Sequence, residues 1–268
     1  MNSLYVIKIG GNVIDDPVQL ESFLKDFSQL RGLKILVHGG GKIATKLAKD
    51  LGIQSELIEG RRVTDAESLK VVSMVYAGLI NKGIVAGLQK DSCNAIGLTG
   101  ADGNIIRAKK RPLKTIADGR QIDYGFVGDL DDSSIDAEAI HKLLSSGFVP
   151  VFSAITHDGN GQLLNTNADT IASVIAVSMS AFYETSLVYC FEKAGVLRNV
   201  DDELSVIKSI DPEQYKILKN EGVIHSGMIP KLDNAFEAIS EGLSEVYIGK
   251  ADALNELQEK TFGTRLKS

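Results

Sequence analysis

The stretch that decides the fold is Val37-His38-Gly39-Gly40-Gly41-Lys42, in which three consecutive glycines end an apolar run and open a helix-like pattern. A similar stretch lies near the start of the chain, Ile7-Lys8-Ile9-Gly10-Gly11-Asn12. Glycine lets the backbone approach a ligand closely and direct several N–H groups at one anion, above all where a helix begins. These two glycine-rich strand ends therefore predict a shared site for one anionic ligand.

Short apolar runs rich in β-branched residues recur along the chain, and helical patterns separate them. The runs are Leu4 to Ile9, Leu33 to Val37, Ala95 to Leu98, Phe148 to Ala154, Ser186 to Phe191 and Val246 to Ile248. Strands that are apolar on both faces suit a covered, mostly parallel sheet. The alternation predicts an α/β layered fold, in which ligands bind beyond the carboxyl ends of the strands.

Three helices and one surface excursion complete this outline. Pro17 is expected in the first turn of one helix, and Thr64-Asp65-Ala66-Glu67 is interpreted as a capping box that opens a long one. The segment from Gly100 to Asp132 is interpreted as a polar excursion with a hairpin. The inward positions expected are Leu69, Val72, Val75, Tyr76 and Leu79 for the long helix, and Leu232, Ala235, Phe236, Ile239 and Leu243 for the third.

Bulk composition narrows the class of protein. The 268 residues carry a formal charge of −6, and no basic run is longer than Lys109-Lys110-Arg111, which argues against a nucleic-acid partner. Cys93 and Cys190 lie far apart, which argues against a disulfide framework or a structural metal. No apolar stretch approaches the ~20 residues of a membrane span. We expect a soluble protein of the cytoplasm, without a membrane partner.

Lys8 lies inside an otherwise apolar strand, where an unpaired ammonium would cost several kcal/mol. One interpretation is an edge-strand lysine whose amine reaches water. The neighbouring Gly10 and Gly11 favour contact with a phosphate instead. Near the other end of the chain, Lys231 follows Pro230 at the start of a helix, where a cation opposes the helix dipole unless an anion lies between them. Both lysines therefore indicate a bound anion.

Two known nucleotide-binding motifs contain glycines at spacings that can be compared with those of Gly39 to Gly41. The P-loop pattern fails, because Ile43 follows Gly41-Lys42 and no glycine stands at position 36. The dinucleotide pattern Gly-x-Gly-x-x-Ala matches Gly39 to Ala44, with Glu59 about twenty residues further on. A nicotinamide-dependent oxidoreductase is therefore an alternative, although it gives Lys8 no purpose.

Polar residues stand two apart in Asn165-Thr166-Asn167-Ala168-Asp169, just before a helical pattern. One of the three, most readily Asn167, is expected to cap the helix. Three exceed what one cap requires, so Asn165 and Asp169 are candidates to bind substrate or to position lysines. Arg62, after a glycine and before the helix cap, could hold a carboxylate with its planar fork.

The chain carries, in order from Lys8 to Leu266, the motifs IKIGGN, VHGGGK, GRRVT, GLTGADG, GFVGDL, GQLLNTNAD, SGMIPK and GTRL. Together they resemble the amino acid kinase family, and within it the members that phosphorylate an N-acylated glutamate. The resemblance implies a three-layer αβα sandwich around a mostly parallel sheet. It also implies one continuous fold in which residues 1–180 bind the acylglutamate and dimerise and residues 181–268 bind ATP.

The resemblance assigns roles residue by residue. Lys8 and Lys231 resemble the lysines that neutralise the transferring phosphoryl group, and Asp169 resembles the aspartate that orients them. Further candidates are Gly10, Gly11 and Gly40 for the phosphoryl group, Gly40, Gly41, Arg62 and Asn165 for the substrate, and Glu192, Gly195 and Lys231 for the nucleotide. The implied reaction transfers phosphate from ATP to the γ-carboxylate of N-acetyl-L-glutamate, or of a relative such as N-succinyl-L-glutamate, in arginine biosynthesis. Mg²⁺ would be held mostly by the ATP phosphates, without a dedicated metal site on the protein.

One segment departs from the family pattern. The nucleotide-half strand usually ends in Ser or Thr followed by Asp-Val, whereas here it reads Tyr189-Cys190-Phe191-Glu192, so Glu192 stands where the aspartate belongs. The sequence starts almost at its first strand, whereas arginine-inhibited members of the family have an N-terminal extension that forms hexamers. The resemblance therefore implies a dimer that arginine does not inhibit. The choice between acetyl and succinyl stays open, and a noncatalytic ligand sensor with the same fold is a further alternative. The presence of Lys8, Asp169 and Lys231 argues against a sensor.

Overall fold

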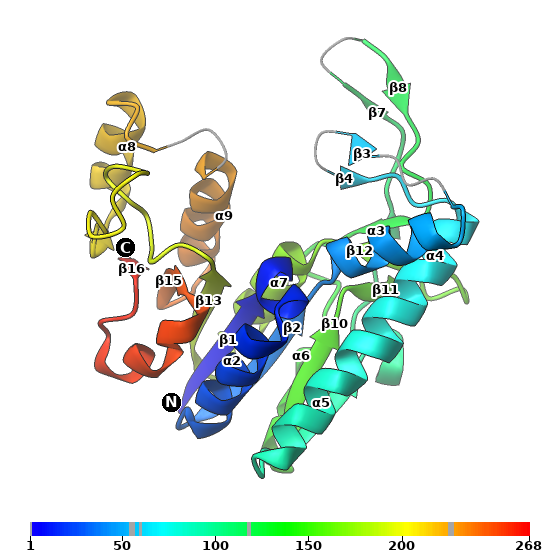
Figure 1. The fold of residues 1–268 in the computed structure, drawn as a ribbon, viewed down its shortest axis with the longest axis horizontal. Coiled ribbons are helices and arrows are strands. Elements are labelled where there is room, and N and C mark those ends of the chain that lie inside the picture. The colour runs from blue at the N-terminus through cyan, green and yellow to red at the C-terminus, as the bar shows by residue number, and fades with distance from the viewer. Residues whose placement is uncertain (1, 54–56, 59–60, 117–118, 225–227) are drawn as a thin grey trace.

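The computed structural model describes residues 2–53, 57–58, 61–116, 119–224 and 228–268. Glu59 of the dinucleotide pattern, Gly60 of the GRRVT motif and residues 225–227, which include the start of SGMIPK, lie outside the described residues. An eight-stranded sheet forms the centre, in the order β14-β16-β15-β13-β1-β2-β10-β5 (Figure 1). Its strands are β1 (Ser3–Ile9), β2 (Leu33–His38), β5 (Ala95–Leu98), β10 (Val149–Ser153), β13 (Glu184–Phe191), β14 (Ser209–Ile210), β15 (Glu245–Lys250) and β16 (Thr264–Leu266).

The sheet is parallel throughout except for the pairing of β15 with β16. All six strands expected from the apolar runs lie in it, so the α/β prediction is confirmed. The apolar residues of β1 from Leu4 to Ile9 are buried on both faces of the sheet, apart from the partly buried Tyr5. Burial on both faces requires a helical layer on each side, and this explains why the strands are continuous apolar runs.

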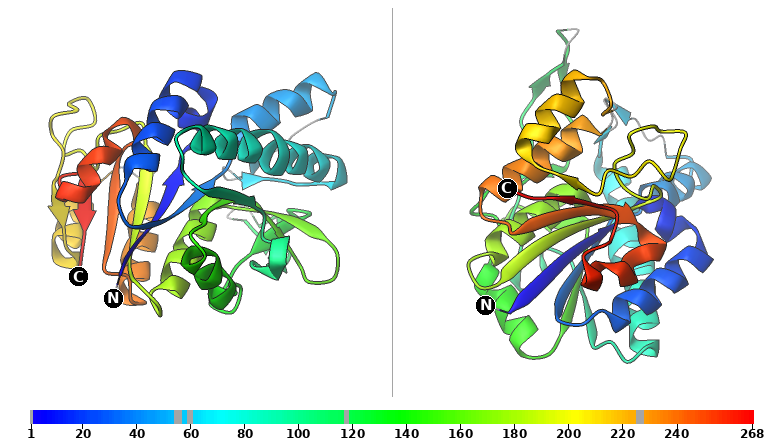
Figure 2. Two further views of the ribbon diagram at one scale, coloured as in Figure 1. Left: turned by 90° about the horizontal axis from the view of Figure 1, so that it is seen from below. Right: turned by 90° about the vertical axis from the view of Figure 1, so that its left-hand side faces the viewer.

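Helices cover both faces of the sheet, as the views in Figure 2 show. One layer holds α1 (Gly11–Asp15), α2 (Pro17–Gln29), α5 (Asn81–Lys90) and the 3₁₀ segment η3 (Ala251–Glu259). The other holds α6 (Ala137–Ser145), α7 (Ala168–Met179) and α9 (Ile229–Ser240). Helices α3 (Gly41–Asp50), α4 (Ala66–Ser73) and α8 (Pro212–Asn220) lie toward the ends of the molecule. The fold is therefore the expected three-layer sandwich.

The central strands end at one level. Ile9 of β1 is in register with His38 of β2 on one side and with Cys190 of β13 on the other. The chain runs outward from β1 in both directions, through β2 and β10 on one side and through β13 and β15 on the other. In open α/β sheets such a switch point forms a crevice at the carboxyl ends of the strands, where ligands bind.

Smaller sheets extend from this edge. One has the order β11-β12-β9-β6, with β6 (Lys109–Lys110), β9 (Val127–Asp129), β11 (Ile155–His157) and β12 (Leu163–Thr166). Two-stranded pairs form from β3 (Leu57–Ile58) with β4 (Arg61–Arg62), and from β7 (Lys114–Thr115) with β8 (Gln121–Ile122). The segment from Gly100 to Asp132 also holds the 3₁₀ turn η2 (Asp102–Asn104) and does contain a hairpin, as expected.

The long helix differs from expectation in two respects. Its cap is Asp65, whose side chain accepts a hydrogen bond from the Ser68 N–H, so the capping box of Thr64 with Glu67 was wrong. Helices α4 and α5 are joined by a π-helical segment, η1 (Met74–Ile80). The wider π turn advances the inward position by one residue, so Ile80 is buried and Leu79, expected inside, is 64% exposed.

This continuous helix, 66–90, is long and apolar enough to cross a membrane by length and composition alone. The most apolar 18 residues of this helix are 44% buried inside the protein. Its inner residues Val72, Val75, Ile80 and Ile84 are part of the main hydrophobic core. Packing in the hydrophobic core therefore explains the apolar character of this helix.

Candidate active site

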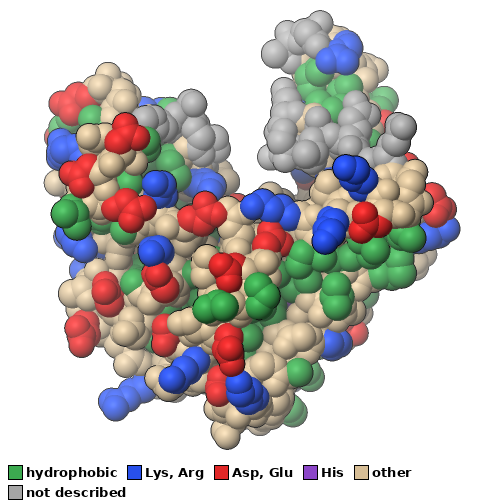
Figure 3. All heavy atoms as spheres, in the orientation of Figure 1, with side chains coloured by type: hydrophobic (Ala, Val, Ile, Leu, Met, Phe, Trp, Pro, Cys, Tyr) green, Lys and Arg blue, Asp and Glu red, His purple; other side chains and the backbone are tan. Residues whose placement is uncertain are grey.

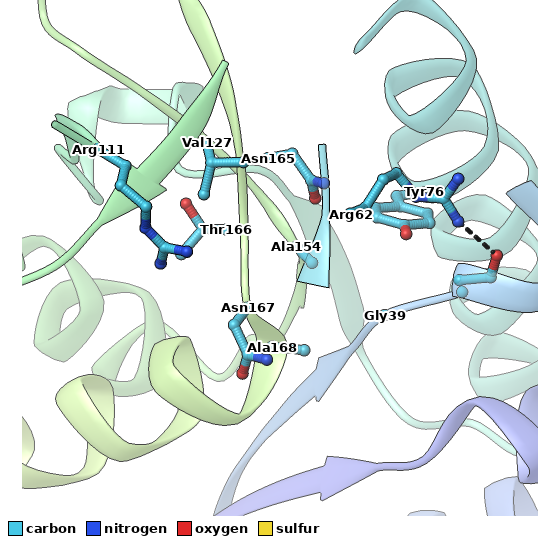
Figure 4. Close-up of a pocket in the computed structure, with 12 residues that line it drawn as sticks. Gly39, Arg62, Tyr76, Arg111, Val127, Ala154, Asn165, Thr166, Asn167 and Ala168 are labelled. Atoms are coloured by element: carbon cyan, nitrogen blue, oxygen red, sulfur yellow. Dashed lines mark hydrogen bonds between the residues drawn. The ribbon is translucent and has the colours of Figure 1, made fainter. Parts of the chain in front are cut away.

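Two adjoining cavities open at the carboxyl edge of the central strands. The first has a volume of about 260 Å³ and is lined by Gly39, Gly40, Gly41, Arg62, Tyr76, Arg111, Val127, Ala154, Asn165, Thr166, Asn167 and Ala168 (Figure 4). The second has a volume of about 460 Å³ and is lined by Lys8, Gly10, Gly11, Asn12, Val13, Gly41, Lys42, Phe191, Glu192, Lys193, Gly195, Met228, Lys231 and Ile248. Gly41 lines both, so the start of α3 forms their boundary. In Figure 3 the surface is hollowed above this edge, between the side of α8 and α9 and the side of β7 and β8.

Arg62 is held at one side of the first cavity. Its Nη2 donates to the Gly41 carbonyl at 3.0 Å and to Thr45 Oγ1 at 2.6 Å, which ties β4 to the first turn of α3 (Figure 4). Burial raises the pKa of the nearby Tyr76 hydroxyl while Arg62 lowers it, so Tyr76 stays a neutral phenol at physiological pH. The two hydrogen bonds from Nη2 fix the Arg62 guanidinium in place before any ligand arrives.

Asn165 and Asn167 have separate roles. Asn167 is the cap of α7, because its side chain accepts a hydrogen bond from the Thr170 N–H, as expected. Asn165 lies in β12, where its Nδ2 donates to Thr64 Oγ1 at 3.0 Å. This bond orients the Asn165 amide beside Arg62 in the cavity wall (Figure 4). Cation and amide together suit a bound carboxylate.

Lys8 has a carboxylate partner. Its Nζ lies 2.8 Å from Oδ1 of Asp169, which stands in the first turn of α7. Of the Lys8 side chain 11% is exposed, and of the Asp169 side chain 29%. The pair offsets the cost of burying the ammonium within β1 and points it toward the second cavity. The alternative of an edge-strand lysine is wrong, because β1 lies between two strands.

Lys231, in the first turn of α9, lies near the same aromatic ring as Lys8. Its Nζ lies 3.8 Å from the centroid of Phe191, and the Lys8 Nζ lies 5.2 Å from the same centroid. Burial lowers the pKa of Lys231, Asp169 opposes this effect, and Lys8 adds to it. Two partly desolvated ammonium groups near one ring repel each other, and a phosphate between them would remove that repulsion.

The glycines differ in what keeps them free of side chains. A Cβ on Gly40 would lie 2.2 Å from Ile80 Cδ1, which would have to shift, and the φ of +150° favours glycine there. Gly11, at the start of α1, has open space where its Cβ would be. The Gly10 N–H already donates to the Cys190 carbonyl at 3.1 Å. Gly11 and Gly40 therefore remain as the candidate N–H donors to a phosphoryl group.

The segment that departs from the family pattern lines the second cavity. Glu192 is exposed at its rim, directly after β13. Gly195 is buried, and a Cβ on it would lie 2.7 Å from Thr264 Oγ1, which in turn accepts a hydrogen bond from the Val196 N–H. The predicted site residues thus fall into two groups: those for the nucleotide line the second cavity, and Arg62 and Asn165 line the first.

Two clusters in these walls escaped sequence analysis. Lys42, in the first turn of α3, donates a hydrogen bond to Asn12 Oδ1 and lies 3.9 Å from Asp15, so it adds a cation to the second cavity. Arg111 lines the first cavity and pairs with Asp129. Lys42 belongs to the VHGGGK motif and Arg111 to the run Lys109-Lys110-Arg111, but their partners Asn12 and Asp129 lie 30 and 18 positions away, so the sequence does not show these contacts.

Such a site defines a class of protein: an α/β phosphotransferase that holds a small carboxylate in one cavity and a phosphorylated donor in the next. The chain belongs to the amino acid kinase family, whose model matches residues 3–250.

Relatives agree with this assignment. The acetylglutamate kinase of Cytophaga hutchinsonii is 56% identical over 268 residues, which cover 99% of each chain. The acetylglutamate kinase of Bacteroides fragilis is 53% identical over 266 residues, 98% of this chain and 97% of that one. Among solved structures, smu.665 from Streptococcus mutans is similar over 98% of both chains, with 27% identity and a TM-score of 0.75.

Proposed function

We propose that this protein transfers the γ-phosphoryl group of ATP to the γ-carboxylate of an N-acylated L-glutamate, N-acetyl-L-glutamate or a close relative, as a step of arginine biosynthesis. The observation that carries the proposal is the meeting of Lys8 and Lys231 over Phe191, with Asp169 fixing Lys8 at 2.8 Å. Two acetylglutamate kinases share more than half of the sequence over nearly the full length, which supports the same reaction.

The chemistry needs no covalent intermediate and no strong base, because the acceptor carboxylate is already ionised at neutral pH. Arg62 and Asn165 hold the substrate's α-carboxylate in the first cavity. The γ-carboxylate then reaches the boundary at Gly40 and Gly41, where the donor phosphate approaches from the second cavity. Positioning and charge neutralisation by the two lysines supply the rate enhancement. The product is an acyl phosphate.

ATP occupies the second cavity, with its phosphates near Gly11 and the two lysines and its remainder toward Glu192 and Gly195. Mg²⁺ that accompanies ATP neutralises charge on the phosphates. This ion commonly keeps water and phosphate oxygens as most of its ligands. One carboxylate in the wall, that of Glu192, fits such an ion, and no cluster of three or more His, Cys, Asp or Glu side chains occurs among the described residues.

We further propose that residues 1–180 bind the acylglutamate and dimerise, that residues 181–268 bind ATP, and that the enzyme works in the cytoplasm. Exposed apolar side chains support the dimer. Met74 and Leu79, both on η1 of the first part, are 55% and 64% exposed. Figure 3 shows hydrophobic side chains gathered over the region of α3 and α4. A second copy of this chain would cover them.

The two alternatives from sequence analysis lose support. The glycines at 39–41 do follow a strand and open a helix, as a dinucleotide fingerprint requires. That function, however, leaves the Lys8–Asp169 pair and Lys231 without a role, and the chain belongs to a kinase family. A noncatalytic sensor would have no need to keep both lysines beside an orienting carboxylate.

The proposal is tested by trapping the acyl phosphate with hydroxylamine in the presence of magnesium and ATP. We expect a hydroxamate with N-acylated L-glutamates and little with free glutamate or aspartate. Asp169→Asn should lose most of this activity while it still binds ATP. Hydroxamate formation from aspartate alone, or none from any acylglutamate despite measurable ATP binding, would overturn the proposal.

A further inference from the structure

Arg111 lies at the far side of the first cavity from Arg62 (Figure 4). It follows β6, and 11% of its side chain is exposed. Its Nε donates to both carboxylate oxygens of Asp129, at 3.0 and 3.1 Å, and Nη2 donates to Oδ1. The guanidinium carbon lies 5.2 Å from the centroid of the Tyr124 ring. Ring and carboxylate therefore fix one edge of the guanidinium.

The other edge has no acceptor within the described part of the chain. Nη1 of Arg111 is buried and has no hydrogen-bond partner among the residues that the structure describes. Buried donors are almost always paired, and a buried donor on a charged group is the costliest to leave unpaired. In Figure 4 the guanidinium of Arg111 points into the cavity, toward Thr166 and Asn167. An acceptor supplied by a bound molecule would complete its hydrogen bonding.

The proposed function fixes which part of the substrate reaches Arg111. The α-carboxylate goes to Arg62 and Asn165, and the γ-carboxylate goes to the glycines at the boundary with the second cavity. The N-acyl group is the remaining branch of the substrate, and the wall that holds Arg111 is the part of this cavity left for it. Val127 and Ala154 supply apolar surface in the same cavity, which suits the methylene groups of an acyl chain.

We propose that Arg111 is a specificity-determining residue that binds a carboxylate at the end of the substrate's N-acyl group. The preferred substrate is then an N-acylglutamate whose acyl chain is a dicarboxylic acid, as in N-succinyl-L-glutamate, rather than one that ends in a methyl group. The inference rests on the proposed function and deepens it. A fork held on one edge by Asp129 presents its free N–H groups to such a carboxylate without further ordering.

The test compares N-succinyl-L-glutamate with N-butyryl-L-glutamate, which has the same chain length but ends in a methyl group, and with N-acetyl-L-glutamate. Hydroxamate formation gives kcat/KM for each. We expect the succinyl compound to exceed the butyryl compound by about tenfold to a hundredfold, the value of a charge-assisted hydrogen bond. Equal or better use of the butyryl compound overturns the inference and leaves the proposed function intact. Activity with none of the three overturns both.

The variant Arg111→Met tests whether the preference for the succinyl over the butyryl compound depends on the Arg111 side chain. We expect the succinyl-to-butyryl ratio of kcat/KM to fall close to one. Lys110→Met is the matched control, because Lys110 is the preceding residue, is exposed, lies over Phe126 and does not line the cavity; it should keep the wild-type ratio. An unchanged ratio in Arg111→Met overturns the inference.

A binding measurement does not depend on turnover. Wild-type protein without nucleotide should show a larger rise in melting temperature with N-succinyl-L-glutamate than with N-butyryl-L-glutamate at equal concentration. Arg111→Lys keeps the charge but loses the planar fork, so the difference should shrink without loss of the fold. Equal shifts for both compounds in wild-type protein would contradict a carboxylate contact at Arg111.

Discussion

The side-chain amide of Asn81 lies 3.1 Å from Nε2 of His38, although 43 positions separate the two residues in the chain. Asn81 begins α5, and its Nδ2 also donates to the Val151 carbonyl of β10. Because this nitrogen can only donate, Nε2 of His38 must accept, and Nδ1 carries the proton that it donates to the Gly39 carbonyl at 2.9 Å. A neutral imidazole thus connects the long helix to the start of the glycine loop.

Acid should break this connection. Burial lowers the pKa of His38 from 6.5 to about 4. The unfolded chain therefore binds a proton between these pH values that the folded protein does not, so stability is complete above pH 6.5 and falls as the pH drops toward 4. We expect wild-type protein to lose about 3 kcal/mol relative to His38→Asn between pH 7 and pH 4. Urea unfolding at each pH, at fixed protein concentration, measures the difference; parallel pH profiles would contradict it.

Two buried lysines on neighbouring strands should respond to mutation in opposite ways. Lys34 of β2 donates to the carbonyls of Phe27, Ser28 and Leu30, at or just beyond the end of α2, at 2.7, 2.8 and 2.7 Å. Lys34→Met should therefore lower the unfolding free energy by about 2 kcal/mol or more, and leave kcat nearly unchanged. Chemical denaturation and a hydroxamate assay on one preparation measure both quantities.

Lys8→Met should show the reverse pattern. Its partner Asp169 is 29% exposed as a side chain, although the Oδ1 that faces Lys8 is buried, so the variant should lose some stability and still fold. Turnover should fall by about a hundredfold to a thousandfold, because one of the two cations facing the phosphoryl group is lost. A folded Lys8→Met protein with normal turnover would refute the role given to this lysine.

Much of the fold could be predicted from the sequence because the patterns that define its strands and helices are local. Apolar runs located six of the eight strands of the central sheet, Pro17 and Asn167 marked helix starts, and the motif order predicted the family. The Lys8–Asp169 pair is also implied by two motifs that are 161 positions apart but characteristic together. The sequence is sufficient to predict a helix or strand whose buried residues follow a regular spacing within that one element.

The remaining features depend on contacts between distant segments. The π turn of η1 shifts Ile80 inward, where its side chain fills the space beside Gly40, and no local pattern at 74–80 marks this change of period. The free edge of Arg111 exists only because Asp129, on another strand, takes the opposite edge. Long-range packing of this kind is not encoded in the spacing of nearby residues.

The exposed face of η1 predicts the state of assembly. If a second copy covers Met74 and Leu79, the double change Met74→Glu with Leu79→Glu should convert the dimer into a monomer, because two carboxylates would be buried without partners. Sedimentation velocity measures this. Leu204→Glu is the control, since Leu204 is 94% exposed in the other part of the chain and should leave the dimer intact. A wild-type protein that sediments as a monomer would contradict the dimer.

Gly40 and Gly11 allow packing to be separated from ligand binding. Gly40→Ala places a methyl group 2.2 Å from Ile80 Cδ1 at a φ of +150°, so it should destabilise the protein by about 1–3 kcal/mol and lower activity. Ile80→Ala removes the obstructing atom, so the double variant should recover part of the loss that the two single changes would give together. Additive losses would show that Ile80 is not what constrains this position.

Gly11→Ala should behave differently, because no atom of the described residues lies within 4 Å of the new Cβ and Gly11 begins a helix. Thermal unfolding should be unchanged or slightly raised, since alanine is the better helix former. Activity should still fall, chiefly as a lower kcat, because the methyl group stands beside the N–H proposed to hold the phosphoryl group. If Gly11→Ala kept full activity, the glycine would serve only the turn into α1, and the phosphoryl group would have to be held by Gly40 and the two lysines alone.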